Sequence, residues 1–136
     1  MLQIVIPGKP MSGNHAKTPQ VIGRTASGKP RFRNVRTAEA RLYDERVASI
    51  GKAAAAIARW KIPDYVRCDT WLCNVRTDGE NANKEIRDPL QGIAFWFDSR
   101  ILDGRTIKCK DKYGPRVVLQ IRPVDGKLYG YRRPHA

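Results

Sequence analysis

A single long helix is the strongest structural pattern in this sequence of 136 residues. Residues 38–60 are rich in alanine, the best helix former, and larger apolar side chains recur among them at helical spacing: Leu42, Val47, Ile50, Ala54 and Ile57. Thr37 is placed to cap the first turn of this helix, and Pro63 ends the region. The length of the chain fits one compact domain, so this helix must pack against the other elements of that domain.

The remaining patterns predict a small sheet and a second helix. In chain order they are strands at 2–6, 69–77 and 116–122, an extended segment at 100–110 and a helix at 81–92. Residues 7–34 are rich in Gly, Pro, Lys and Arg and predict a long basic loop, and residues 123–136 predict a loose basic tail. We therefore expect one α+β domain over residues 1–136, with a small mixed β-sheet and two main helices packed on it.

The composition is strongly basic, with 26 Lys and Arg against 13 Asp and Glu and a net charge of +13. Such a charge favours an acidic partner, and nucleic acid is a commoner one than a membrane surface. The longest apolar run, Ala53–Ala58, is too short to span a bilayer, and the N-terminus lacks the pattern of a signal peptide. Three cysteines without C-x-x-C spacing indicate incidental thiols in a reduced, cytoplasmic protein, and argue against a zinc site.

Acidic residues are concentrated in one short segment of this basic chain. Residues 78–98 hold five carboxylates and two cations, a net charge of −3, whereas the rest of the chain carries +16. The five are Asp78, Glu80, Glu85, Asp88 and Asp98. Oxygen ligands grouped in this way suit magnesium or manganese, which would neutralise the segment as a phosphodiester approaches. The other interpretation is a basic binding protein whose acids cap helices and pair with nearby cations.

One part of the basic loop imitates a phosphate-binding loop. Gly23–Pro30 follows the spacing G-x-x-x-x-G-K, but Pro30 occupies the position that needs a Ser or Thr hydroxyl and a helical N–H. No helical pattern begins there either, so we expect no nucleotide cofactor. The cations of this loop are instead expected to contact backbone phosphates.

Three short motifs follow one another within residues 78–101. They are Asp78-Gly79-Glu80-Asn81-Ala82-Asn83-Lys84, then Asp88-Pro89-Leu90-Gln91-Gly92-Ile93, then Asp98-Ser99-Arg100-Ile101. In the type and spacing of their acids and lysine, these motifs resemble the signature of the RusA family of Holliday junction resolvases. A looser similarity, in Pro10–Asn14 and in the basic C-terminal half, extends over most of the chain.

The resemblance implies a magnesium-dependent endodeoxyribonuclease that resolves four-way DNA junctions during recombination and repair. Asp78, Glu80 and Asp98 would then be catalytic residues that bind Mg²⁺, with Mn²⁺ as an alternative. Lys84 would be the catalytic lysine near the scissile phosphate, and Asn81 would hold one carboxylate through its amide. A homodimer would nick two symmetry-related strands, and the protein would be nucleoid-associated and of bacterial or phage origin.

Three positions depart from the family pattern. Glu80 replaces the usual Asp and lengthens that ligand, and Phe97 replaces a second acid beside Asp98. Pro89 replaces the usual Ala and predicts a kink, or a helix that restarts there. Asp88 is expected to order the helix rather than to bind metal. None of these departures removes a ligand position, so we expect activity.

Two basic segments supply the expected DNA contacts, which should be made mainly to phosphates. The residues are Arg31, Arg33, Arg36, Arg105, Lys108, Lys110 and Lys112. Taken with the resemblance, these cations imply a four-way junction or another branched DNA as the partner. Two alternatives stay open: a non-catalytic basic nucleic-acid-binding protein, and a related metal-dependent nuclease that acts on other branched DNA.

Overall fold

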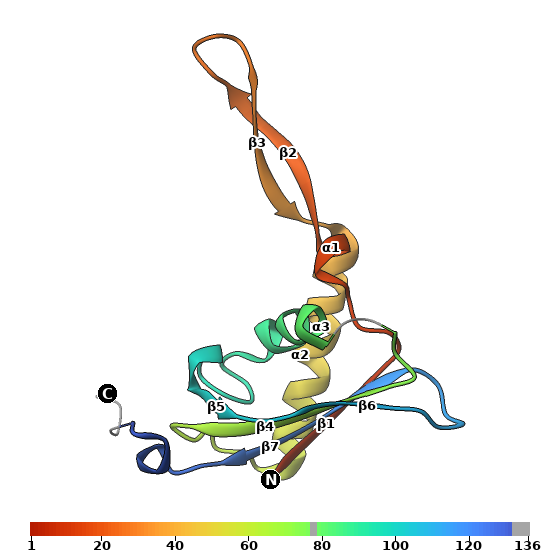
Figure 1. Cartoon of the computed structure of the whole chain (residues 1–136), viewed down its shortest axis with the longest axis vertical. Helices are drawn as coiled ribbons and strands as arrows, with labels where there is room; N and C mark the ends of the chain where they lie inside the picture. The colour runs from red at the N-terminus through yellow and green to blue at the C-terminus, as the bar shows by residue number, and fades with distance from the viewer. Residues whose placement is uncertain (77–78, 132–136) are drawn as a thin grey trace.

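The molecule consists of a layered body and a thin arm that projects from it (Figure 1). The computed structural model describes residues 1–76 and 79–131, and only the backbone of residues 14, 15, 80 and 81. The body contains a mixed five-stranded sheet and two main helices, as predicted, so the α+β class is confirmed. The homodimer stays a prediction.

The sheet of the body combines antiparallel and parallel pairs. Its strands are β1 (Leu2–Pro7), β4 (Val66–Cys73), β5 (Ile101–Asp103), β6 (Thr106–Cys109) and β7 (Arg116–Pro123). β7 pairs with β1 on one side and with β4 on the other, both antiparallel. β5 and β6 run parallel to β4, one beside each half of it. β4 is therefore the central strand and leads from the middle of the sheet toward the predicted acidic site.

The strands agree with the sequence analysis at the two ends of the chain and differ in the middle. The predicted strands 2–6 and 116–122 are confirmed by β1 and β7. β4 begins and ends earlier than predicted. It ends at Cys73 because the chain turns at Asn74, which has a φ of 57°. The extended segment 100–110 is split at Gly104, where an added Cβ would collide with the carbonyl oxygen of Cys68.

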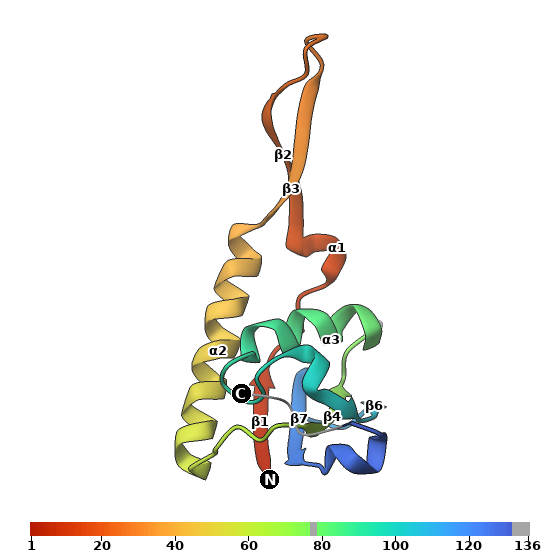
Figure 2. The same ribbon diagram turned by 90° about the vertical axis from the view of Figure 1, so that its left-hand side faces the viewer.

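The helices lie on one face of the sheet (Figures 1 and 2). They are α2 (Ala38–Ala58), α3 (Gly79–Arg87) and the short 3₁₀ helix η1 (Asp88–Leu90). The core beneath them includes Leu2, Ile4, Val47, Leu72, Leu90, Phe95, Val117 and Leu119. α2 crosses close over η1, since an added Cβ at Gly51 would lie 2.5 Å from Cδ2 of Leu90.

The predicted long helix is confirmed by α2, and its cap is as expected. The Thr37 side chain accepts a hydrogen bond from the backbone N–H of Ala40 at 3.1 Å. The predicted apolar stripe is partly wrong, because Leu42 and Ile57 are 66% and 87% exposed while Ala40 and Tyr43 are buried instead. Within residues 1–76 and 79–131, α2 and the other helices lack the apolar length needed to cross a membrane.

The second helix shows the break predicted at Pro89. α3 starts at Gly79, two residues before the predicted start, and ends at Arg87. The chain continues from there as η1, with Pro89 in its first turn. Proline lacks the N–H that an α-helical hydrogen bond would need, so the tighter 3₁₀ turn replaces the last helical turn.

The expectation of three incidental thiols is wrong for two of the cysteines. Cys73 and Cys109 are register partners on β4 and β6, and a disulfide joins them across Cα atoms 4.6 Å apart. They are 36 positions apart in sequence, so only strand pairing reveals that they are neighbours. Cys68 is a free, buried thiol, and burial raises its pKa.

The predicted long loop 7–34 is also wrong, because most of it forms the arm. After the short helix α1 (Gly13–Ala16), strands β2 (Lys17–Arg24) and β3 (Pro30–Arg36) pair antiparallel as a hairpin. Its tip is closed by a hydrogen bond from the Gly28 N–H to the Thr25 carbonyl at 2.9 Å. All side chains of β2 are exposed. The alternation of apolar and polar residues that marks a half-buried strand is therefore missing.

Residues 124–131 pack against the body, where the sequence analysis expects a loose tail. They contain the 3₁₀ helix η3 (Gly126–Tyr129). The Val124 N–H donates to the Tyr65 carbonyl at 3.1 Å, and an added Cβ at Gly126 would lie 2.6 Å from the Tyr65 ring. Residues 132–136 lie outside the described part of the chain.

Candidate nucleic-acid and metal site

The start of α3 is fixed against the edge of the sheet. An added Cβ at Gly79 would lie 2.9 Å from Cγ2 of Thr106 on β6. One turn later, Nδ2 of Asn83 donates to Oγ1 of Thr106 at 2.9 Å. Ala82 is buried and Lys84 is exposed, as expected for two sides of an amphipathic helix. The predicted catalytic lysine is therefore held on a clamped helix and faces solvent.

Two of the three predicted metal ligands cannot be placed by their side chains. Asp78 lies outside the described residues, and Glu80 and Asn81 are described by their backbone alone. That backbone puts Glu80 in the first turn of α3, four residues before Lys84. Side chains at this spacing share one side of a helix.

The third predicted ligand, Asp98, is exposed at the start of the 3₁₀ helix η2 (Asp98–Arg100). The loop that leads to it is anchored in the core by Phe95, which is fully buried. The Gly92 N–H donates to the Phe95 carbonyl at 2.7 Å, and the Trp60 indole N–H donates to the Ala94 carbonyl at 2.9 Å. This tight loop reverses the chain after η1.

After this loop, Asp98 lies near enough to Asp88 for the two carboxylates to interact. Burial raises the pKa of Asp88; the Lys84 ammonium lowers it, and the Asp98 and Glu85 carboxylates raise it. Asp88, which the sequence analysis assigns to ordering the helix, is thus a further acid of this neighbourhood.

The donor set suits a divalent cation. Neighbouring ionised carboxylates repel one another, and a bound cation relieves this repulsion. Magnesium prefers oxygen ligands such as carboxylates. Among the side chains that the structure describes, no three acidic, His or Cys groups form a ready metal cluster. The predicted set depends on Asp78 and Glu80, whose side chains are not among those described.

A hollow of about 500 Å³ lies beside the predicted catalytic lysine. Lys84 and Asp88 line it from α3 and η1, and Lys17 and Arg36 line it from the base of the arm. The arm and the candidate site are therefore adjacent, although the sequence separates Arg36 from Lys84 by a long helix and a strand.

Arg36 ties the base of the arm to both helices. Its Nε and Nη2 atoms donate to the Asp44 carboxylate at 2.5 and 2.6 Å, and Nη2 lies 2.6 Å from Oε2 of the buried Glu85. Asp44 and Glu85 together raise the pKa of the Arg36 guanidinium. Its charge is balanced inside the protein, whereas Arg31 and Arg33, the other predicted DNA contacts of the arm, are exposed.

The second group of predicted DNA contacts borders the start of α3 from the other side. Arg105, Lys108, Lys110 and Lys112 are all exposed. Lys108 lies two residues after Thr106 on β6, so it shares the face of the sheet that contacts α3. A hollow of about 620 Å³ is lined by Lys108, Lys110 and Arg76. Arg76 was missed by the sequence analysis, because nothing in its local pattern sets it apart.

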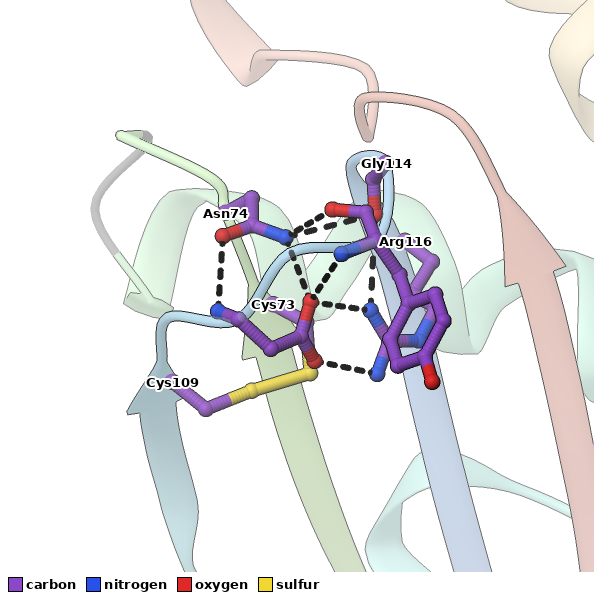
Figure 3. A network of polar contacts seen from close by, with 7 residues as sticks. Cys73, Asn74, Cys109, Gly114 and Arg116 are labelled. Carbon is purple, nitrogen blue, oxygen red and sulfur yellow. Dashed lines mark hydrogen bonds and ion pairs between the residues drawn. A yellow bond between two sulfur atoms is a disulfide. The ribbon is translucent and has the colours of Figure 1, made fainter.

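A polar network holds the end of β4, just before the acidic segment (Figure 3). Asn74 Nδ2 donates to Oδ1 of Asp111 at 2.9 Å, and Asn74 Oδ1 accepts from the Asp111 N–H at 3.1 Å. The Arg116 guanidinium donates to both oxygens of Asp111 at 3.1 and 2.6 Å. Arg116 and Asn74 thereby lower the pKa of Asp111. Together with the neighbouring disulfide, these bonds fix the strand from which the chain leaves toward Asp78.

No model of a known protein family matches this chain, and no curated protein matches it.

Proposed function

We propose that the protein is a magnesium-dependent endonuclease that cuts branched DNA and prefers four-way junctions. The observation that carries this proposal is the place of Lys84 and Asp88 on one hollow beside α3, with Asp98 near enough for its carboxylate to raise the pKa of Asp88. Glu80 stands in the first turn of the same helix. An exposed lysine among acids, inside a chain of net charge +13, suits the handling of a phosphodiester.

The chain's own groups have distinct parts in this proposal. Asp78, Glu80 and Asp98 would hold the magnesium ion, which when bound polarises the phosphodiester and offsets its charge. Lys84 adds a fixed positive charge beside the hollow, where it stabilises negative charge that develops on the phosphate. Because α3 is clamped at its start by Thr106, this charge is held in place before the substrate arrives.

Exposed cations border the candidate site on two sides. The arm carries Arg31 and Arg33 and begins at the hollow beside Lys84, while Lys108 and Lys110 lie along and after β6. Duplex segments that diverge from one point would meet both groups at once, whereas a single straight duplex would not. This arrangement supports branched DNA as the substrate, and a two-fold dimer would supply the second nick.

The test is cleavage of an end-labelled four-way junction with magnesium, with calcium, and with a chelator. We expect symmetric nicks with magnesium alone, and much slower cleavage of a linear duplex of matching sequence. Binding without cleavage under every condition would overturn the proposal. Equal cleavage of junctions, flaps and forks would favour the related nuclease of broader substrate range.

Two substitutions test the roles of the side chains. Asp98→Asn should lower the single-turnover rate at saturating protein by at least about a hundredfold, as should Lys84→Ala. Asp98→Asn should leave junction binding intact or strengthen it, because a negative charge that faces phosphates is removed. Glu39→Gln and Lys52→Ala are the matched controls, since each removes an exposed charge outside the proposed catalytic set and outside the hollow beside Lys84. Rates equal to those of the controls would remove Asp98 and Lys84 from the catalytic set.

A non-catalytic nucleic-acid-binding protein is the second candidate. The exposure of Arg31 and Arg33 on the arm favours it, because phosphate binding needs no acidic site. Salt-dependent binding to junction and duplex with equal affinity, and without magnesium-dependent cleavage, would select this candidate.

A further inference from the structure

The arm has two chemically different faces. Side chains alternate between the faces of a strand, and register partners share a face. On one face, Gln20 is the partner of Arg33 and Gly23 is the partner of Arg31. On the other, Val21 is the partner of Phe32. One face therefore presents Gln20, Arg31 and Arg33, and the opposite face presents the apolar pair Val21 and Phe32 between Asn34 and Arg24.

The positive charge of the arm is not neutralised by acidic residues on the hairpin. The chain contains no Asp or Glu before Glu39, so no carboxylate lies on the hairpin itself. Arg36 is balanced at the base, but Arg31 and Arg33 lie farther out and are exposed. Val21 and Phe32 are 56% and 60% exposed as well, so the arm's side chains do not contribute to the core. The exposed guanidinium groups of Arg31 and Arg33 can therefore contact an external polyanion.

The arm is nevertheless fixed in direction. The Thr37 N–H donates to the carbonyl of the buried Ala16 at 2.9 Å, which closes the hairpin at its base. The ion pairs of Arg36 add bonds to α2 and α3. Both views show the arm extending away from the body beyond the start of α2 (Figures 1 and 2). The β2–β3 hairpin is therefore formed, and its direction is fixed, before a partner binds.

The dimensions and donors of the arm fit one groove of duplex DNA. The major groove admits a two-stranded β-ribbon, and the minor groove is about half as wide. Eight residues of β2 span about 25 Å at the rise of a β-strand, or about seven base pairs. Arginine pairs with the O6 and N7 acceptors of guanine, and glutamine pairs with adenine. The Gln20, Arg31 and Arg33 face holds both donor types.

We propose that the arm enters the major groove of a duplex segment with its Gln20, Arg31 and Arg33 face and gives the protein a base preference there. This deepens the proposed function, on which it rests for the assignment of that duplex to a branched substrate. It also adds contacts with base edges to the expected contacts, which were mainly to phosphates. The opposite face, with Val21 and Phe32 at its middle, is then turned away from the bases.

The test uses the full-length protein without magnesium, so that binding is measured without cleavage. Short duplexes with a randomised centre are selected for binding and sequenced, with the wild type and with an Arg31→Ala/Arg33→Ala variant. We expect the wild type to enrich a guanine-containing motif and the variant to enrich none. Replacing guanine by 7-deazaguanine in the selected duplex removes the N7 acceptor, and should weaken wild-type binding by about tenfold.

A matched control separates base reading from loss of charge. Lys52→Ala/Lys61→Ala removes two exposed cations at the far end of α2 and should keep the 7-deazaguanine effect. The arm variant should bind normal and modified duplexes alike. The proposal is overturned if the wild type enriches no motif, if the arm variant keeps the motif, or if 7-deazaguanine has no effect.

Two further outcomes are distinct from these. If Phe32→Ala converts a dimer into a monomer in sedimentation and abolishes the base preference, the arm pairs two copies and the groove proposal fails. If the base preference depends on the arm but no branched DNA is cut, the proposed function fails and the groove proposal stands.

Discussion

In the body, β1 and β7 bury alternate side chains and β4 buries six of its eight, whereas β2 and β3 of the arm bury none. The body thus gains stability from apolar surface removed from water, at roughly 25 cal/mol per Å². The arm is held by backbone pairing between its two strands and by the contacts where it joins the body. An isolated hairpin is marginally stable in water.

The contrast separates residues that the fold requires from residues that a partner would require. Arg36 belongs to the first kind, because it joins Asp44 and Glu85 where the arm meets the body. Arg31 and Arg33 lie exposed on the same strand, and in our proposal they belong to the second kind. Neighbouring arginines of one basic segment therefore have different roles, which their shared residue type conceals.

The largest difference is expected between the effects of two Phe→Ala substitutions on the free energy of unfolding. Phe95→Ala removes a fully buried ring and should lower the free energy of unfolding by about 3–5 kcal/mol. Phe32→Ala removes a ring that is 60% exposed on the arm and should change it by less than about 0.5 kcal/mol. Urea denaturation followed by circular dichroism measures both. Equal losses would show that the arm packs as part of the core.

The disulfide should contribute the next largest effect, and only to the body. Cys73 and Cys109 close a loop between residues 36 positions apart, so Cys73→Ser/Cys109→Ser should cost about 2–4 kcal/mol of unfolding free energy. Dithiothreitol should lower the denaturation midpoint of the wild type and leave that of the double variant unchanged. A wild-type midpoint that does not respond to the reductant would contradict the assigned bond.

Shortening the arm should leave the body intact and weaken DNA binding. Pro19 and Asn34 are register partners, so they can be joined through an Asn-Gly turn that replaces residues 20–33. The unfolding free energy should change by less than about 0.5 kcal/mol. The log–log salt slope of binding should fall by up to about 0.9 for each of the four cations removed, as titrations by fluorescence anisotropy would show. An unchanged slope would mean that the arm does not touch DNA.

The smallest expected effect concerns the network at the end of β4. Arg116 and Asn74 hold the pKa of Asp111 below its unfolded value of about 3.9. A lowered pKa adds stability above the unfolded value, and this stability is lost as the pH falls through the folded value. Asp111→Asn should therefore lower the thermal midpoint slightly at neutral pH, and the gap to the wild type should close in acid. A gap that is constant with pH, or one that Glu45→Gln on the exposed side of α2 reproduces, would contradict this.

Much of the site's composition is visible in the sequence, but its assembly is not. The exposed position of Lys84 and the break at Pro89 follow from local rules of helix geometry and proline chemistry. The approach of Asp98 to Asp88 depends on a loop anchored by Phe95 and Ala94, whose partners lie elsewhere in the chain. The hydrophobic periodicity of the sequence does not predict contacts between such distant segments.

The sequence by itself determined the α2 helix with its Thr37 cap, the strands β1 and β7, and the charge that favours a polyanionic partner. These features depend on neighbours within a few residues or on composition alone. The tertiary structure decided the Cys73–Cys109 bond, the internal role of Arg36 and the change of residues 17–36 from a loop to an arm. Each depends on strand register or on packing between distant segments, which a local pattern does not encode, and the exposed arm lacks even the burial pattern that reveals other strands.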